Sequence, residues 1–332
     1  MFVEHFKKYA EYVQSDFKLS PSAFVFEIGS NDGTLLSFFK KSGCSVLGVD
    51  PALKIAEDAT ARGIPTLPRF FSSSLVDEVL TNHPQPKVII ANNVFAHIDD
   101  LDEVARGVCK LLDPNEGIFV IEFSYLADVI EKNLFDTIYH EHLCYHSLKP
   151  LRQFFQKHGM EVIDTLRVPS HGGSLRVVAQ VKGARRPVSD RVESLIAFEK
   201  TAGLYEFSTF QNFGKSIERI GIELKGILTQ LKSQGKSIAG FGAPAKATTL
   251  MYQFGIGPEI VDFIIDDSPL KQGLFTPGFH IPVLSSNAIR ERKPDYLVLL
   301  AWNFADSIIA KNSDYLAQGG HFIVPLPRVQ VV

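Results

Sequence analysis

Hydrophobic and polar positions in the first half of the chain alternate in the way typical of an α/β protein. Short apolar runs are separated by stretches in which apolar residues recur at helical spacing. The apolar runs predict strands at Phe24–Ile28, Ser45–Val49, Val88–Ala91 and Gly117–Glu122. The helical stretches are Thr34–Lys41, Leu53–Arg62, Leu101–Leu111 and Leu151–His158. Continuous apolar runs mark strands buried on both faces, so the sheet is predicted to be mostly parallel. Residues 161–167 and 174–181 predict an antiparallel hairpin at its edge.

A second α/β pattern begins after Gly235. Strands are predicted at Ser237–Phe241, Ile260–Ile265, Tyr296–Leu300 and His321–Val324, and a helix at Lys246–Phe254. The stretch from Ser189 to Leu231 is charged and helical and carries no strand signal. We therefore expect a Rossmann-like domain in residues 1–186, a helical linker in residues 187–234, and a second, smaller Rossmann-like α/β domain in residues 235–332.

Composition narrows the class of protein. The chain has 332 residues, 45% hydrophobic and 21% charged, with a formal net charge of -3, which disfavours nucleic acid or an anionic membrane as partner. No apolar run approaches the roughly 18 residues of a membrane span, and the charged N-terminus does not follow the plan of a secretory signal. Cys44, Cys109 and Cys144 form no CxxC pair. We expect a cytoplasmic monomer or homodimer with reduced thiols.

A glycine-bearing loop follows the first predicted strand. Glu27 ends that strand, and Gly29 and Gly33 allow the backbone to approach a ligand closely. A dinucleotide fingerprint would need glycine where Asn31 stands, so the loop favours a nucleoside without a pyrophosphate. Asp50, at the end of the next strand, is placed to accept the ribose hydroxyls. Glu27 as a loop-stabilising carboxylate and Asp50 as a helix N-cap remain the alternatives.

A cluster of ionisable side chains lies between Phe135 and Leu148. It contains three histidines, a glutamate, two tyrosines and a cysteine among apolar residues. Such a cluster favours proton transfer or metal binding, with a solvated histidine-rich helix as the plain alternative. Cys144 stands where the metalloprotease string needs its second histidine, so no metal site is expected from His140, His142 and His146.

Several strings together resemble a known family. The Glu27 loop followed by Asp50 resembles the S-adenosylmethionine site of class I methyltransferases. Residues 30–36 (SNDGTLL), 136–142 (DTIYHEH), 171–176 (HGGSLR) and 240–249 (GFGAPAKATT) resemble sugar C-methyltransferases of deoxysugar biosynthesis, which methylate carbon 3 of a nucleotide-linked 4-keto-6-deoxysugar. The resemblance implies S-adenosyl-L-methionine as cofactor, bound by Glu27, Gly29, Asn31, Gly33, Asp50, Asn92 and Asn93. That family usually begins with a zinc domain carrying paired CxxC motifs, which this sequence lacks, so no zinc is expected.

The same resemblance implies roles for the cluster. His142 is the expected general base that forms an enolate, and Glu141 is expected to orient its imidazole. Tyr139 or His97 is expected to stabilise the enolate oxygen. For His97, which follows the strand ending near Asn92, a structural loop histidine is the alternative.

The expected substrate is a nucleotide-linked keto sugar held partly by the second domain. Two glycines and Lys246 at a predicted helix start favour a cradle for its diphosphate, with Arg176 as helper, although a tight turn explains the same residues. Asp266 and Asn303 lie at strand ends and are expected to hold the nucleotide or the sugar. An NAD-dependent oxidoreductase of nucleotide sugars and a non-catalytic nucleotide-sugar-binding protein remain alternative functions.

Overall fold

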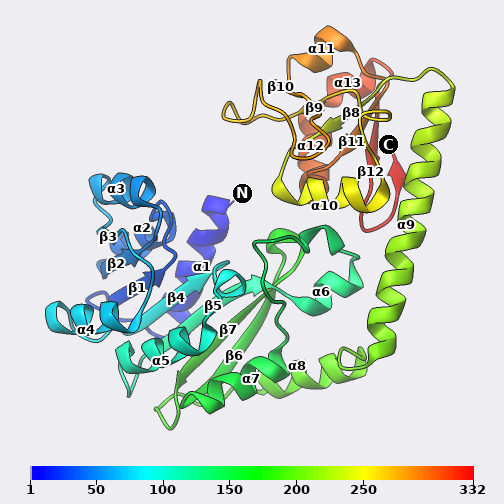
Figure 1. Cartoon of the computed structure of the whole chain (residues 1–332). Coiled ribbons are helices and arrows are strands. Elements are labelled where there is room, and N and C mark those ends of the chain that lie inside the picture. The colour runs from blue at the N-terminus through cyan, green and yellow to red at the C-terminus, as the bar shows by residue number, and fades with distance from the viewer. Residues whose placement is uncertain (1) are drawn as a thin grey trace. The chain divides into compact units, whose positions relative to one another are not determined.

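The chain folds into two compact units (Figure 1). The computed structural model describes residues 2–332. The first unit contains the chain up to Ala127 and the segment from Leu143 to Leu204. The second contains Asp128–His142 and Tyr205–Val332. The boundaries of these units differ from the predicted domain boundaries at two places, the segment Asp128–His142 and the helix at Asp190–Thr201.

The first unit is built on a seven-stranded sheet in the order β3-β2-β1-β4-β5-β7-β6. Its strands are β1 (Phe24–Ile28), β2 (Ser45–Val49), β3 (Thr66–Leu67), β4 (Val88–Asn92), β5 (Ile118–Ser124), β6 (Met160–Val168) and β7 (Ser174–Val181). The first five strands pair in parallel, whereas β7 is antiparallel to both β5 and β6. The predicted parallel sheet with an antiparallel hairpin at its edge is confirmed.

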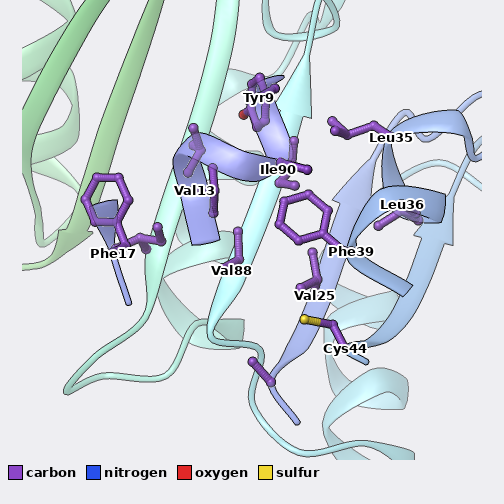
Figure 2. Close-up of a cluster of buried hydrophobic side chains, with 14 of the residues drawn as sticks. Tyr9, Val13, Phe17, Val25, Leu35, Leu36, Phe39, Cys44, Val88 and Ile90 are labelled. Carbon is purple, nitrogen blue, oxygen red and sulfur yellow. The ribbon is translucent and has the colours of Figure 1, made fainter. Parts of the chain in front are cut away.

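Helices cover both faces of this sheet, as a doubly wound fold requires. They are α1 (Phe2–Asp16), α2 (Thr34–Lys41), α3 (Leu53–Ala61), α4 (Ser73–Asn82), α5 (Leu101–Leu111), α7 (Leu148–Lys157) and α8 (Asp190–Thr201), and α6 (Leu126–Glu131) lies where the chain passes to the second unit. Helix α1 was not predicted. Its fully buried Tyr9 and Val13 pack with Phe39 of α2 and Val88 of β4 in one hydrophobic cluster (Figure 2), so α1 is part of the core.

Helix α8 belongs to the first unit and not to a linker. Glu199 of this helix is completely buried. Its Oε1 accepts hydrogen bonds from the Tyr125 hydroxyl at 2.9 Å and from the Leu148 N–H at 2.6 Å. The Glu199 carboxylate thus satisfies a donor at the N-terminus of α7, where backbone N–H groups have no partner within the helix. Only the following helix, α9 (Phe207–Ser233), joins the second unit, so the predicted linker is divided between the units.

The second unit has a six-stranded sheet in the order β10-β9-β8-β11-β12-β13. Its strands are β8 (Ile238–Phe241), β9 (Ile264–Ile265), β10 (Val283–Leu284), β11 (Tyr296–Leu299), β12 (His321–Val324) and β13 (Gln330–Val331). Its helices after α9 are α10 (Ala245–Phe254), α11 (Ala288–Arg292), α12 (Ala305–Lys311) and α13 (Ser313–Ala317). All pairs except β12 with β13 are parallel, so the predicted second α/β domain is confirmed. Strand β9 is shorter than predicted, because Val261 donates its N–H to Gly257 in a turn.

The segment Asp128–His142 packs with the second unit although it was predicted within residues 1–186. The Phe135 ring lies 4.9 Å from the Phe254 ring of α10, measured between centroids. The Asn133 side chain donates to the Pro327 carbonyl at 3.4 Å. These contacts join residues more than a hundred positions apart, so local sequence patterns do not reveal them. Within residues 2–332, no helix combines the length and apolar character that crossing a bilayer demands.

Candidate functional site

A cavity of about 460 Å³ opens at the carboxyl ends of β1, β2 and β4 in the first unit. The chain order of the strands reverses between β1 and β4, and doubly wound folds bind ligands at such a point. The lining residues are Val3, Phe6, Glu27, Gly29, Ser30, Asn31, Asp32, Thr34, Leu35, Asp50, Asn92, Asn93 and Val94. The structure therefore brings together all the residues predicted to bind the cofactor except Gly33.

The glycines shape this cavity. Gly29 has a φ of 66°, and a Cβ added there would lie 2.3 Å from Cγ1 of Val94. Gly33 has a φ of 73° and would place a Cβ 2.8 Å from Ile64, so it packs the loop against its own unit and does not line the cavity. Asn31 also adopts a positive φ, of 48°, which asparagine tolerates better than most residues. The loop conformation thus depends on these three residues, two glycines and an asparagine.

Asp50 ties the loop to the end of β2. Its Oδ2 accepts the N–H of Asn31 and its Oδ1 accepts the N–H of Ala52, both at 2.9 Å. Each carboxylate oxygen can accept more than one hydrogen bond, so both retain capacity for a ligand hydroxyl. Asp50 therefore stabilises the loop and faces the cavity at once.

Several polar side-chain atoms are buried at the cavity. Within the part of the chain that the structure describes, Glu27 Oε2, Ser30 Oγ and both amide atoms of Asn92 have no hydrogen-bond partner. Burial, reinforced by the charges of Asp32 and Asp50, raises the pKa of Glu27 well above its ordinary value. An unpaired buried carboxylate is costly unless a ligand supplies a donor or a cation. The ammonium and the hydroxyls of S-adenosylmethionine are groups of that kind, so the cavity fits this cofactor.

A buried ionic network lies beside the cavity. The Arg176 guanidinium donates to Oε2 of Glu122 through Nε at 3.0 Å and Nη2 at 2.8 Å, and lies 3.9 Å from the centre of the Tyr9 ring. Oε1 of Glu122 is 2.7 Å from Nε2 of His5 and accepts the Ser170 hydroxyl at 3.0 Å. Burial alone would raise the pKa of Glu122, but its His5 and Arg176 partners hold that pKa below the ordinary value.

This network changes the interpretation of Arg176. The residue is 3% exposed, and its guanidinium pairs with the buried Glu122 instead of lying on an open surface. Sequence reasoning missed His5 and Glu122. A glutamate within the apolar run Ile118–Ser124 was the available signal, because a buried carboxylate implies a buried cation.

The candidate catalytic side chains Tyr139 and His142 are neighbours in the segment of the second unit. Their ring centroids are 4.6 Å apart. His142 Nδ1 lies 2.7 Å from the Thr137 carbonyl oxygen. A carbonyl only accepts hydrogen bonds, so Nδ1 carries a proton and Nε2 is the basic nitrogen of the neutral ring. The Thr137 carbonyl thus orients the imidazole, which is the role that the resemblance gave to Glu141, an exposed residue.

The other histidines have different surroundings. His97 ends the short 3₁₀-helix η1 (Phe95–His97) of the first unit and is exposed. The His146 ring packs 5.3 Å from the Phe95 ring and 5.0 Å from the Phe123 ring. Burial lowers the pKa of His146 to about 4, so this ring is neutral at physiological pH. Across residues 2–332, no group of three or more His, Cys, Asp or Glu side chains is arranged to hold a metal ion.

Lys246 of the second unit has an internal partner. Its Nζ lies 3.4 Å from Oδ2 of Asp136 and 3.8 Å from the centre of the Trp302 ring. The Trp302 indole N–H donates to the same Oδ2 at 2.5 Å. Asp136 is completely buried. The charge expected to bind a diphosphate is therefore compensated by a buried carboxylate.

The two remaining predicted substrate residues differ from each other. Asp266 accepts the N–H of Ala243 at 2.7 Å and of Ser268 at 2.9 Å, and so holds the loops after β8 and β9. Burial acts to raise its pKa, but these hydrogen bonds and Lys271 leave it below the ordinary value. Asn303 lies in the 3₁₀-helix η4 (Trp302–Phe304), and its buried Oδ1 has no partner among residues 2–332.

Comparisons with known proteins agree with this architecture. A methyltransferase domain model matches residues 3–165, and a C-methyltransferase C-terminal domain model matches residues 169–327. The chain is 37% identical to the C-methyltransferase NovU of Streptomyces niveus over 330 residues, which is 99% of this chain and 78% of NovU.

Solved methyltransferase structures are similar over about half of the chain. Magnesium protoporphyrin IX methyltransferase from Synechocystis is 15% identical, with a TM-score of 0.42, over 54% of this chain and 82% of its own. An S-adenosylmethionine-dependent methyltransferase from Clostridium acetobutylicum is 11% identical, with a TM-score of 0.43, over 54% of this chain and 92% of its own. On the two domain matches and the similarity to NovU, the chain belongs to the S-adenosylmethionine-dependent C-methyltransferases.

Proposed function

We propose that this enzyme methylates carbon 3 of a nucleotide-linked 4-keto-6-deoxysugar through an enolate, with His142 as general base. The observation that carries the proposal is the hydrogen bond between His142 Nδ1 and the Thr137 carbonyl, because it makes Nε2 the basic nitrogen. The sugar class is supported by the strings that resemble sugar C-methyltransferases.

The cofactor is proposed to bind in the cavity of the first unit. Glu27 and Asn92 would meet its polar groups, because their buried atoms lack partners within residues 2–332. Asp50 would accept ribose hydroxyls, while Gly29, Asn31 and Asn93 line the same space. When bound, S-adenosylmethionine supplies an electrophilic methyl group on a sulfonium.

The proton chemistry falls to the segment Asp128–His142 of the second unit, which we call the histidine segment. Nε2 of His142 takes the proton from the carbon next to the ketone, and the ring becomes an imidazolium. The Thr137 carbonyl stabilises this cation because it still accepts the hydrogen bond from Nδ1. The Tyr139 hydroxyl donates to the enolate oxygen, with His97 as the alternative donor. We keep the Glu141 carboxylate in the proposal as a negative charge next to His142 in the chain.

Of the expected substrate residues, Asn303 keeps a direct role in this proposal. Its buried amide oxygen lacks a partner in the described part of the chain and suits a hydroxyl of the sugar or nucleotide. Arg176, Lys246 and Asp266 have internal partners, so we place no substrate group on them.

Deuterium exchange tests the base. The enzyme is incubated in D₂O with S-adenosylhomocysteine and a panel of nucleotide-linked 4-keto sugars, and exchange at carbon 3 is followed by NMR. Methyl transfer is measured in a separate incubation with S-adenosylmethionine, because S-adenosylhomocysteine carries no methyl group to transfer. We expect exchange and methyl transfer with the wild type, loss of both in His142→Asn, and both retained in His140→Asn, the exposed control. Exchange that survives in His142→Asn would contradict the assignment.

Calorimetry on the same preparations separates the alternative functions. We expect the enzyme to bind S-adenosylhomocysteine and not to bind NAD. Binding of NAD instead would support an oxidoreductase. Binding of the sugar without exchange or turnover on any member of the panel would support a non-catalytic binding protein.

A further inference from the structure

The histidine segment is fastened to the second unit by a buried ionic group. Asp136 lies in the 3₁₀-helix η2 (Phe135–Thr137), and its Oδ2 receives both the Trp302 indole N–H and the Lys246 ammonium. The ammonium also lies over the indole ring, which is a cation–π geometry. We call Asp136, Lys246 and Trp302 the anchor.

The two charged groups of the anchor are largely buried. The Asp136 side chain is 0% exposed, so its carboxylate is shut off from water, and the Lys246 side chain is only 15% exposed. Burial raises the pKa of Asp136 and lowers that of Lys246, while each charge opposes the shift of the other. A buried ion pair adds little net stability, but removing one partner leaves an unpaired charge inside the protein. In some proteins such a pair serves mainly to fix one geometry.

The anchor is directly connected to His142 through the backbone. Asp136 is followed by Thr137, whose carbonyl oxygen receives the Tyr139 N–H at 3.1 Å and faces His142 Nδ1 at 2.7 Å. The Thr137 hydroxyl in turn donates to the Leu134 carbonyl at 2.7 Å. Holding Asp136 therefore holds the carbonyl that selects the tautomer of His142.

We propose that Asp136, Lys246 and Trp302 are positioning residues for His142: the anchor holds the Thr137 carbonyl in place and so keeps Nε2 as the basic nitrogen. This inference rests on the proposed function, in which His142 is the base. It gives Lys246 a role in positioning the base, whereas the sequence favoured a role for Lys246 in binding the diphosphate of the substrate.

The two roles of Lys246 predict opposite kinetics. If Lys246 belongs to the anchor, Lys246→Met lowers kcat about 10- to 100-fold and leaves KM for the nucleotide sugar nearly unchanged. If Lys246 binds the diphosphate, KM rises and kcat is retained. Lys311→Met is the matched control, because Lys311 pairs with Asp267 at 2.6 Å on the exposed surface of the same unit. It should keep both constants.

Two further variants guard against a misfolded protein. Trp302→Phe keeps an aromatic ring under the ammonium but removes the N–H that binds Asp136 together with part of the ring volume, and we expect an intermediate loss of kcat. The double variant Asp136→Asn with Lys246→Met removes both charges, so no unpaired charge stays buried. It should fold, and its kcat should remain low because the anchor is absent.

The His142 tautomer provides a readout that needs no substrate. Long-range ¹H–¹⁵N correlation spectra of the histidine-labelled enzyme, assigned with His142→Asn, should show a protonated Nδ1 in the wild type and a tautomer mixture in the folded anchor variants. Wild-type kcat and tautomer in folded Lys246→Met and Trp302→Phe would overturn the anchor. A wild type that never exchanges carbon 3 would overturn the proposed function, while the spectra would still decide the anchor.

Discussion

Arg176→Met separates a structural role of this arginine from the substrate role that the sequence predicted. The substitution keeps most of the aliphatic stem and removes the guanidinium that donates to Glu122 and lies over Tyr9. His5 and Ser170 remain as partners of the carboxylate, whose side chain is 1% exposed. Removing one partner of a buried pair costs about 3–5 kcal/mol, and we expect a loss in that range for the first unit.

Hydrogen–deuterium exchange of the β5 and β7 amides measures this loss, because β5 carries Glu122 and β7 carries Arg176. A two-unit chain does not guarantee a single unfolding transition, so a local probe is preferable to a global melting curve. The control is Arg152→Met. Arg152 also pairs with a glutamate, Glu193, but their side chains are 28% and 71% exposed, so about 0–1 kcal/mol is expected.

The pH dependence of the stability of the first unit provides a second measurement of the same interaction. The folded-state pKa of Glu122 lies below its unfolded value, so its partners stabilise the protein above the unfolded pKa, and this stabilisation is lost as the pH falls through the folded pKa. Arg176→Met should weaken this acid dependence. Unchanged protection of β5 and β7 together with a higher KM for the nucleotide sugar would refute the structural role and restore the predicted substrate contact.

Two more predictions concern the cofactor cavity. Gly29→Ala places a Cβ 2.3 Å from Val94 on a residue with left-handed backbone angles. The first unit should lose about 1–2 kcal/mol of stability from the backbone strain and about 1–3 kcal/mol from the clash. Calorimetry should also show weaker binding of S-adenosylhomocysteine, and wild-type stability and affinity would contradict this. Because burial raises the pKa of free Glu27, binding of the ammonium of S-adenosylhomocysteine should release a proton and strengthen with pH above the ordinary glutamate pKa. Calorimetry in buffers of different ionisation enthalpy measures that release, and Glu27→Gln should abolish it; an equal release in the variant would contradict the assignment.

The sequence by itself determined the α/β architecture and brought out most of the residues that line the cavity in which we propose that the cofactor binds. Continuous apolar runs and helical spacing are local patterns, and the glycines and acids at the ends of β1 and β2 are local features too. For that reason Glu27, Gly29, Asn31 and Asp50 were found from sequence alone and line one cavity. The histidine segment was also visible, because its residue types are concentrated in one stretch.

Only the tertiary structure decided which charges have internal partners. Lys246 and Arg176 stand out in sequence as free cations, and their partners Asp136 and Glu122 lie 110 and 54 positions away along the chain. The tertiary structure also assigned Asp128–His142 to the second unit and α8 to the first. Long-range pairing in the interior depends on which side chains are desolvated together, and a linear pattern carries no record of that.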